Sequence, residues 1–350
     1  MILVIGEADD DHVVLVTRRL DERNARYFIF DPRHYPTSVE LTVEFDRAGA
    51  MRRQLAHRSG RLDLAEVRAV WHRARGRPVP HTNLKDDQVW WVAESSLRFL
   101  CQVYEGLDCF WVPEKPVPER EPFVADPTVD PRSYFGAHRA IRLQVPSPEN
   151  KLHQLSVAGR IGLAIPRTLV TNDPDRFLDF YDACDGELIS KRAADFYPRV
   201  DGKPTRPFTM AVERRDIAGS SCIRYAPVVF QEMIPKQVEL RVTVVGAKAF
   251  AAEIRSQESA RQSVDWRHAP AYGQSKYYAR HQLPAAVESR CVEVVEQLGM
   301  CFGAMDLILT PDGEYVFLEV NMNGQWAYIE QMLDFPISSE IAELLVRADG

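Results

Sequence analysis

Residues 304–324 read AMDLILTPDGEYVFLEVNMNG, and this stretch predicts a β-hairpin that decides the fold. Two runs, 304–310 and 315–321, have the length and the largely apolar composition of strands. Between them, TPDG at 310–313 has the composition of a type I turn, with proline in the second position and glycine in the fourth. We therefore expect two antiparallel strands joined by a tight turn.

The register of this hairpin brings two acids face to face. A loop of residues 311–314 pairs Thr310 with Tyr315. Counting back along both strands then places Asp306 opposite Glu319. Directly opposed carboxylates repel each other unless a cation lies between them.

Asn321 adds a third oxygen-bearing side chain to the same end of the hairpin. It lies two residues after Glu319, so the two side chains share a face, while the apolar neighbours Met305 and Val320 point to the other face. Hard oxygen ligands with room for water and phosphate are what magnesium prefers. The hairpin therefore predicts a magnesium site that includes Asp306, and the alternative is a solvated acidic strand end.

The composition excludes several function classes. The chain has 350 residues, of which 45% are hydrophobic and 27% charged, which is typical of globular rather than disordered or fibrous proteins. A net charge of −7 argues against non-specific nucleic-acid binding. No run approaches the roughly 18 to 20 apolar residues that span a bilayer, and the acidic start MILVIGEADDDH lacks the basic region of a secretory signal. We expect a cytoplasmic protein without a nucleic-acid or membrane partner.

The order of patterns along the chain indicates an α/β protein in several parts. Residues 1–30 read as strand, helix and strand. The segment 113–148 is rich in proline, which sustains neither a helix nor a central strand, and it predicts a linker or an extended excursion. We therefore expect an N-terminal α/β domain at 1–112, the proline-rich segment at 113–148, and a second region at 149–350.

Two lysines are candidates for binding phosphate. The sequence contains neither GxxxxGK[ST] nor GxGxxG, so the usual phosphate-binding loops are absent. Lys151 opens the predicted helix ENKLHQL, and Lys191 closes the predicted strand ELISK. Together with the acidic hairpin they can neutralise phosphate oxygens as point charges, although each alone is equally an ordinary surface lysine.

A short connector is a candidate for reading a nucleotide base. VVFQEMIPK at 228–236 ends a predicted strand in this connector, and Glu239 and Arg241 follow on one face of the next strand. Backbone groups of such a connector can read an adenine edge, and Glu239 can accept hydrogen bonds from ribose hydroxyls. The alternative is a β-bend with an ordinary salt bridge.

The ordered set of these motifs resembles an ATP-grasp carboxylate ligase over about residues 150–350. The set comprises the helix lysine, the strand lysine, VVFQEMIPK, ELRVTVVG, AEIRSQ, MDLIL and FLEVNMNGQW. NKLHQLSVAGRIGLAIPRTLVTNDP and the DWR at 265–267 are most similar to graspetide ligases, the microviridin-type peptide maturases. The N-terminal pattern and VWHRARG at 70–76 resemble the pre-ATP-grasp domain of that group. The resemblance implies an ATP-grasp fold of two α+β lobes that grip ATP, preceded by an N-terminal α/β pre-ATP-grasp domain.

The resemblance also implies a role for each candidate residue. It assigns the binding of ATP to Lys151, Lys191, Gln231, Glu232, Met233, Ile234 and Glu239. Within this set the two lysines contact phosphates, the backbone at 232 and 234 reads adenine, and Glu239 holds the ribose. It assigns Mg2+ to Asp306, Glu319 and Asn321, and catalysis to Lys191, Arg241 and Arg255.

The function implied by the resemblance is ATP-dependent ligation on a ribosomal precursor peptide with a leader and a core. Asp or Glu side chains become acyl phosphates, and Thr, Ser or Lys side chains attack them to close macrocyclic esters or amides. A homodimer is implied as well. Within this interpretation the loop at 195–210 is a candidate lid, and His268 is a candidate base.

Two departures and two alternatives accompany the resemblance. The proline-rich segment is longer than usual in the family, and His72 interrupts a tryptophan–arginine pattern. One alternative is an ATP-grasp ligase that joins an amino acid to a small acid or a protein tail. The other is a non-catalytic nucleotide-binding or partner-binding protein.

Overall fold

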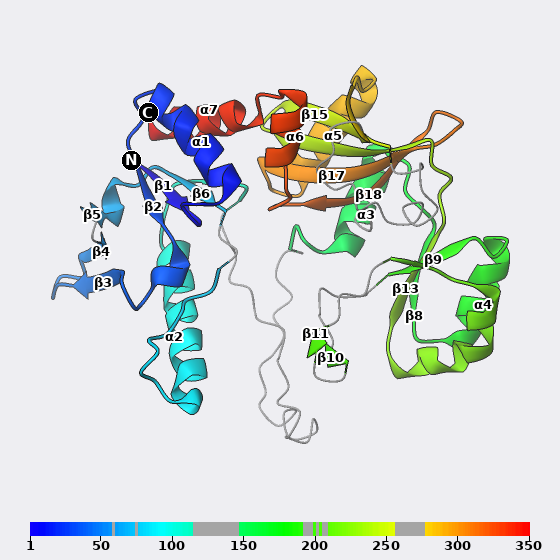
Figure 1. Ribbon diagram of the computed structural model, residues 1–350, viewed down its shortest axis with the longest axis horizontal. Helices are drawn as coiled ribbons and strands as arrows, with labels where there is room; N and C mark the ends of the chain where they lie inside the picture. Colours follow the sequence, from blue (N-terminus) through cyan, green and yellow to red (C-terminus); the bar gives the residue numbers. More distant parts are fainter. Residues whose placement is uncertain are drawn as a thin grey trace. The chain divides into compact units, whose positions relative to one another are not determined.

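The chain divides into two compact units, shown in the computed structural model (Figure 1). The structure describes residues 1–57, 60–73, 76–114, 147–191, 199–200, 203–204, 209–255 and 277–350. Unit 1 comprises Met1–His153, Leu298–Gly303 and Pro336–Gly350, and unit 2 comprises Gln154–Gln297 and Ala304–Phe335. The predicted domain boundaries at 112 and 148 stay predictions, since residues 115–146 lie outside the described part.

A four-stranded parallel sheet in the order β2-β1-β6-β7 forms the centre of unit 1. Its strands are β1 (Ile2–Ile5), β2 (Tyr27–Phe30), β6 (Ala69–His72) and β7 (Phe110–Val112). Every residue of β1 is buried, as expected for a parallel strand that is covered on both faces. Leu3 and Ile5 pack against the half of α2 (Asp86–Glu105) that carries Leu100 and Val103.

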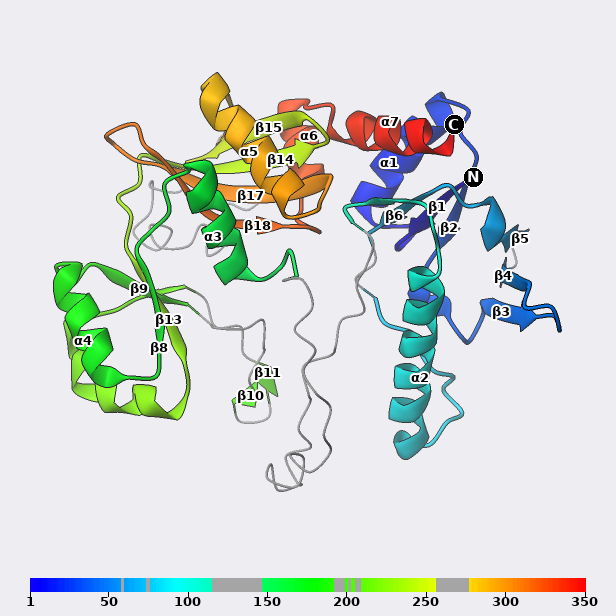
Figure 2. The ribbon, with the colours of Figure 1, turned by 180° about the vertical axis from the view of Figure 1, so that it is seen from behind.

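Helix α1 (Asp11–Glu22) and the closing helix α7 (Ile337–Asp349) lie side by side on this unit (Figure 2). Arg23, the C-cap residue directly after α1, donates from Nη2 to the Ser339 hydroxyl at 2.8 Å. This contact joins residues more than 300 positions apart, and no pattern in the sequence indicates it.

Three strands of unit 1 were not expected from the sequence. They form the antiparallel sheet β3-β4-β5, with β3 (Glu40–Phe45), β4 (Met51–His57) and β5 (Gly60–Asp63). β3, ELTVEF, alternates polar and apolar residues as a half-buried strand does, and this signal was overlooked, whereas β4, MRRQLAH, shows no such alternation. The short 3₁₀ helices of this unit are η1 (Pro32–His34) and η2 (Leu64–Glu66).

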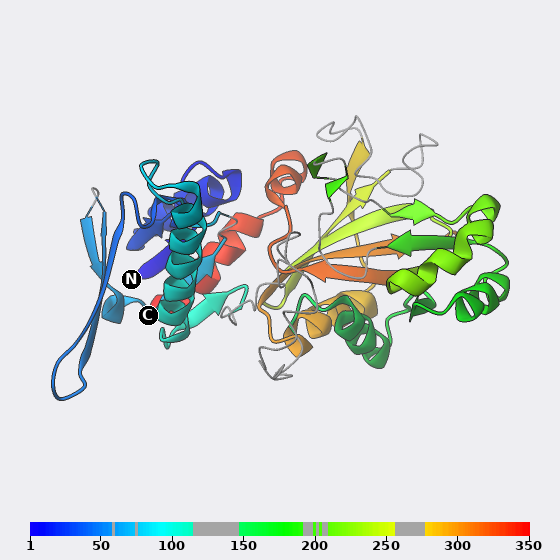
Figure 3. The same ribbon diagram turned by 90° about the horizontal axis from the view of Figure 1, so that it is seen from below.

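The first sheet of unit 2 has the order β12-β9-β13-β8. Figure 3 draws its strands in green to yellow-green. Its strands are β8 (Thr168–Thr171), β9 (Leu188–Lys191), β12 (Met210–Ala211) and β13 (Val228–Glu232). Helix α4 (Pro174–Ala183) begins at the predicted cap, where the Asp173 carboxylate accepts a hydrogen bond from the Asp175 N–H. Phe177 of α4 packs against Leu188 and Phe230, so α4 covers one face of this sheet. The remaining elements here are η4 (Arg214–Tyr225), β10 (Arg199–Val200) and β11 (Lys203–Pro204).

The second sheet of unit 2 has five strands in the order β16-β15-β14-β17-β18. They are β14 (Val238–Val245), β15 (Lys248–Ile254), β16 (Tyr278–His281), β17 (Phe302–Leu309) and β18 (Tyr315–Asn321). The accompanying helices are α3 (Lys151–Ile161), α5 (Ala285–Gln297) and α6 (Ala327–Leu333). Helix α5 contacts β14 and β15, and every residue of β14 is buried.

The hairpin β17–β18 has the predicted facing acids but not the predicted turn register. Tyr315 pairs with Leu309, so the expected pairing of Tyr315 with Thr310 is wrong. A β-bulge then shifts the register between Asp306 and Leu307, and Asp306 pairs with Glu319 as expected. The extra residue in β18 compensates for the different turn, because a bulge places two residues opposite one.

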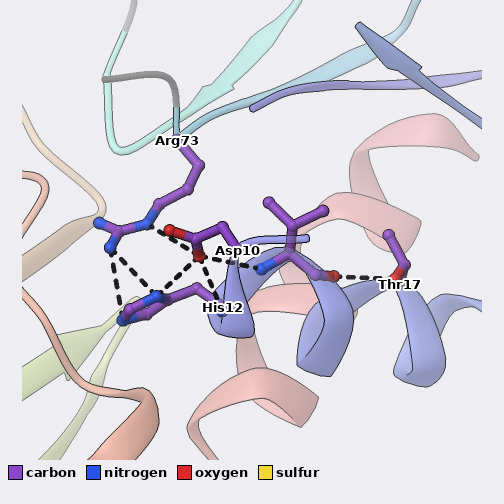
Figure 4. A network of polar contacts seen from close by, with 5 residues as sticks. Asp10, His12, Thr17 and Arg73 are labelled. Carbon is purple, nitrogen blue, oxygen red and sulfur yellow. Dashed lines mark hydrogen bonds and ion pairs between the residues drawn. The ribbon is translucent and has the colours of Figure 1, made fainter. Parts of the chain in front are cut away.

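A polar cluster of Asp10, His12 and Arg73 lies where strand β6 ends and helix α1 begins (Figure 4). Asp10 Oδ1 accepts the backbone N–H of His12 at 2.8 Å, lies 2.8 Å from the His12 Nδ1, and lies 3.7 Å from the Arg73 Nε. Arg73 is buried, although the sequence placed it in a basic patch. Burial alone raises the pKa of Asp10, but the hydrogen bond from His12 and the charge of Arg73 outweigh burial and hold the pKa well below its ordinary value. Asp10 therefore stays ionised and occupies the N-terminus of α1.

His72, which had no explanation from the sequence, is part of an aromatic cluster. Its ring lies 6.1 Å from the ring of Tyr104 and 6.4 Å from that of Trp111, in edge-on geometry. Burial lowers the pKa of His72 to about 4, so the ring is neutral at pH 7. The residue is therefore a packing element of unit 1.

No helix in the described part of the chain is long and apolar enough to cross a bilayer. All six cysteines are free thiols in the structure.

Asp10→Asn tests the ion pair of Asp10 with Arg73. Asparagine preserves the cap of α1 but takes the negative charge of Asp10 away from the buried Arg73, which costs about 1 to 3 kcal/mol. Hydrogen exchange of the α1 amides at pH 7 measures this loss, and Asp9→Asn, at an exposed carboxylate, is the matched control. Because the folded chain lowers the pKa of Asp10, the stabilisation is present above about pH 4 and is lost as the pH falls further. Equal exchange in the two variants at pH 7 contradicts this assignment.

Candidate functional site

The acidic hairpin and β14 bring four polar side chains to one face of the five-stranded sheet. Asp306 pairs with Glu319 and Ala304 with Asn321, so Glu319 and Asn321 lie two residues apart on the same face. Arg241 comes from β14, the strand beside β17. Its Nη1 donates to Asp306 Oδ1 at 2.7 Å. The structure therefore brings together Arg241 and the three predicted metal ligands.

Arg241 is a buried cation held by this acid pair. Its residue exposure is 6%, and its Nη2 also donates to the Gln325 carbonyl oxygen at 3.4 Å. Burial acts to lower the pKa of Arg241, but the charges of Asp306, Tyr328 and Glu319 outweigh it and raise the pKa. The repulsion between the two carboxylates, which the sequence predicted, is thus offset by a guanidinium.

The donor set fits magnesium better than a transition metal. Among the described residues no group of three His, Cys, Asp or Glu side chains gathers, so a site made only of such protein ligands is not formed there. Two carboxylates and an amide are hard oxygen donors, and they leave positions for water and phosphate oxygens. Asp306, Glu319 and Asn321 are the residues that would hold the ion.

Gln154 fixes the position of β18 beside these ligands. Its Nε2 donates to the Val320 carbonyl oxygen at 2.8 Å, and its Oε1 accepts the Val320 N–H at 3.1 Å. β18 is an edge strand, so these two backbone groups would otherwise need other partners. The sequence analysis missed Gln154, although a glutamine among the apolar residues of the predicted helix ENKLHQL was an available signal.

Lys191 and Gln231 lie on a common face of the four-stranded sheet. Val229 pairs with Lys191, and Gln231 pairs with Ile189, so both side chains point away from the face that carries Phe230 and α4. A positive charge and an amide therefore share the face opposite α4.

A chain of hydrogen bonds fixes the orientation of the Gln231 amide. The Thr168 hydroxyl donates to the Pro166 carbonyl oxygen at 2.9 Å, so its oxygen is the acceptor for Gln231 Nε2 at 3.0 Å. Gln231 is 3% exposed, and its Oε1 has no hydrogen-bond partner among the described residues. A buried acceptor without a donor is costly, and it indicates a ligand group that donates a hydrogen bond.

The connector after β13 is anchored at both ends. The Met233 N–H donates to the Glu187 carbonyl oxygen at 2.8 Å, and the Gln237 N–H donates to the Leu309 carbonyl oxygen at 2.8 Å. No described backbone acceptor is bonded to the Ile234 N–H between them. The Glu232 N–H donates to the Arg167 carbonyl oxygen at 3.0 Å, so only its carbonyl oxygen is a candidate for reading a base.

Glu239 forms the salt bridge that the sequence analysis left as an alternative. Its Oε1 lies 2.6 Å from Lys236 Nζ, and both side chains are mostly buried. The carboxylate is therefore held in place by a neighbouring charge and can still accept further hydrogen bonds, since each carboxylate oxygen has two lone pairs.

Arg255 does not join the Arg241 cluster in the structure. It is exposed and lies 3.5 Å from Glu253, which occupies the sheet face opposite that of Arg241. Glu253 in turn contacts His281 at 2.9 Å, and His281 contacts the Tyr315 hydroxyl at 2.9 Å.

The remaining candidates are Lys151, the DWR motif, His268 and the predicted lid. Lys151 is the exposed first residue of α3. Residues 265–267, His268 and most of the predicted lid at 195–210 lie outside the described residues.

Comparison with known proteins identifies the family. The MvdD pre-ATP grasp domain family matches residues 1–116. The macrocyclase MdnB from Microcystis aeruginosa shares 30% sequence identity and a TM-score of 0.71, and the match covers 99% of this chain and 98% of that chain. The chain belongs to the ATP-grasp ligases of the graspetide maturase family. No curated protein sequence matches the chain.

Two further members of this family have solved structures with bound peptide. A RiPP-associated ATP-grasp ligase from Chryseobacterium gregarium, in complex with ADP and a leader and core peptide, has a TM-score of 0.82 and 26% identity, over 99% of this chain and 96% of that chain. MdnC from Microcystis aeruginosa, bound with the precursor peptide MdnA, has a TM-score of 0.77 and 25% identity, over 99% of both chains. The ATP-grasp fold with an N-terminal pre-ATP-grasp domain is thereby confirmed.

Proposed function

We propose that the chain is an ADP-forming ligase that closes macrocycles in a ribosomal precursor peptide. ATP converts an Asp or Glu side chain of the core into an acyl phosphate, and a Thr or Ser hydroxyl or a Lys amine attacks it. An ester or amide forms, and phosphate leaves. The observation that carries the proposal is the pairing of Asp306 with Glu319 in a chain that matches peptide macrocyclases along its whole length.

The proposed site distributes charge so that two anions can meet. A triphosphate and a peptide carboxylate repel each other, and positive groups lower that barrier. Lys151 and Lys191 are proposed to contact phosphates, and Arg241 and Arg255 to neutralise the γ-phosphate and the acyl phosphate. Mg2+ supplies Lewis-acid stabilisation of phosphoryl oxygens when it is bound.

The adenine side of the proposed site rests on hydrogen-bond polarity. The Oε1 of Gln231 can only accept, and the exocyclic amino group of adenine donates, whereas the 6-oxo group of guanine or hypoxanthine accepts. The Ile234 N–H and the Glu232 carbonyl oxygen are the backbone groups proposed to read the ring edge. Met233 is proposed to line the pocket, and Glu239 to accept hydrogen bonds from the ribose.

Three finer expectations also belong to this proposal. The peptide bears a leader and a core, as in the complex of the Chryseobacterium gregarium ligase. The homodimer that the resemblance implies is proposed, and so is the cytoplasmic location that the sequence predicts.

Asp306→Asn and Glu319→Gln test the proposed reaction. Incubating the enzyme with ATP, Mg2+ and a short Thr-, Ser-, Lys-, Asp- and Glu-rich peptide encoded beside its gene should lower the peptide mass by one water per ring. Each variant should form no product. Asp306→Asn should also lower the melting temperature, because it takes the negative charge away from the buried Arg241. Glu319→Gln removes one member of the repelling pair and should fold as the wild type does, so its loss of product reports on the site alone. Glu314→Gln, at an exposed position of the same hairpin, is the matched control and should keep full activity. Full turnover by either site variant contradicts the proposal, and product from a free amino acid instead of the peptide favours the small-acid ligase.

Gln231→Met tests the adenine assignment. The variant keeps the side-chain length but removes the acceptor, so the preference for ATP over ITP should fall about tenfold, the effect of one hydrogen bond of about 1.4 kcal/mol. Isothermal titration calorimetry with each nucleotide measures the ratio of dissociation constants. Gln297→Met, at an exposed position on α5, should leave that ratio unchanged. An unchanged preference in Gln231→Met would remove this side chain from the base pocket.

A further inference from the structure

We propose that Arg241 and a divalent cation compete for the Asp306–Glu319 carboxylates, and that Gly324 admits the guanidinium to this position. The inference rests on the proposed magnesium site. It adds a positioning role for Gly324 and an order of events, in which metal loading releases Arg241 from Asp306.

The first observation is that Arg241 already holds the place of a cation in this acid pair. Its Nη1 lies 2.7 Å from Asp306 Oδ1, and its side chain is 7% exposed against 20% for that of Asp306. A divalent ion bound to this carboxylate at about 2.1 Å would lie close to the guanidinium, and two cations on one carboxylate repel each other, so each weakens the binding of the other.

The second observation is the space at Gly324. A Cβ at this buried position would lie 2.6 Å from Arg241 Nη2 and would collide with the Cβ of Ala304. Gly324 is not among the glycines with positive φ, so the backbone conformation does not itself require glycine. Glycine is therefore needed here for space, and one of the two atoms that need this space belongs to the guanidinium.

The third observation concerns the hydrogen bonds of the Arg241 guanidinium, one of which goes to the residue after Gly324. The Gln325 carbonyl oxygen accepts from Arg241 Nη2 at 3.4 Å, and the Arg241 Nε is buried without a hydrogen-bond partner among the described residues. The guanidinium therefore has one strong partner, Asp306. When an ion takes over Asp306, the guanidinium becomes available to an anion such as a phosphoryl group. Metal loading would thus precede the delivery of this positive charge to the reacting groups.

A Mn2+ titration without nucleotide, followed by electron paramagnetic resonance of the free ion, tests the competition. Arg241→Met should bind Mn2+ at least about tenfold more tightly than the wild type, because removing a nearby cation raises the affinity of the carboxylates for another. Arg176→Met, at an exposed arginine on α4, should bind Mn2+ as the wild type does. Adding Asp306→Asn to Arg241→Met should abolish the gain, which places the gain at this site.

Gly324→Ala tests the positioning role without removing any charge. Because the variant also meets Ala304, it is combined with Ala304→Gly, which relieves that contact and keeps the contact with Arg241. The double variant should unfold at a temperature near that of Ala304→Gly alone and should bind Mn2+ more tightly than it. If Arg241→Met and the double variant both bind Mn2+ with wild-type affinity, the proposed competition is wrong and the proposed metal site still stands. No Mn2+ binding by any variant, with or without ATP, would overturn the proposed metal site as well.

Discussion

Two like charges held face to face on neighbouring strands are the constraint on which the rest of unit 2 depends. Asp306 and Glu319 can remain opposed only if a cation offsets their repulsion, and Arg241 on the adjacent strand provides it. The arrangement needs a fixed register, which the bulge between Asp306 and Leu307 supplies. It also needs a fixed edge strand, which the two hydrogen bonds of Gln154 to Val320 supply. An exchangeable cation between two acids is what a metal-dependent phosphoryl-transfer site requires.

Charged and polar side chains are arranged differently in the two units. In unit 1 the carboxylate of Asp10 occupies the N-terminus of α1, and Arg73 and His12 satisfy it. A helix end already filled by its own anion does not bind a phosphate there. In unit 2, by contrast, Gln231 presents an acceptor and Lys191 a positive charge on a sheet face that α4 does not cover. Apart from Lys151, the residues proposed to contact the nucleotide belong to unit 2.

Patterns that are local in the sequence predicted much of this site. Contacts between residues far apart in the sequence were not predicted. Alternation and turn composition were sufficient to pair Asp306 with Glu319, because both signals lie within about twenty residues. The pairing of Thr310 with Tyr315 was wrong, since no sequence pattern marked the bulge. Arg241 was a candidate for catalysis. Its hydrogen bond to Asp306 joins residues 65 positions apart and depends on the order of the strands in the sheet, which no sequence pattern gives. The sheet β3-β4-β5 was missed although ELTVEF in β3 alternates polar and apolar residues, because β4 (MRRQLAH) does not alternate and one short alternating run is a weak signal.

The central claim is that one divalent cation binds between Asp306 and Glu319, with nucleotide phosphates completing its coordination. A crystal structure of the chain with Mn2+ and ADP, with anomalous scattering data collected at the manganese edge, tests this most directly. The account predicts an anomalous peak at about 2.1 to 2.2 Å from oxygens of both carboxylates, with Arg241 displaced from Asp306. A peak elsewhere, with Arg241 still bonded to Asp306 and nucleotide bound, would contradict it.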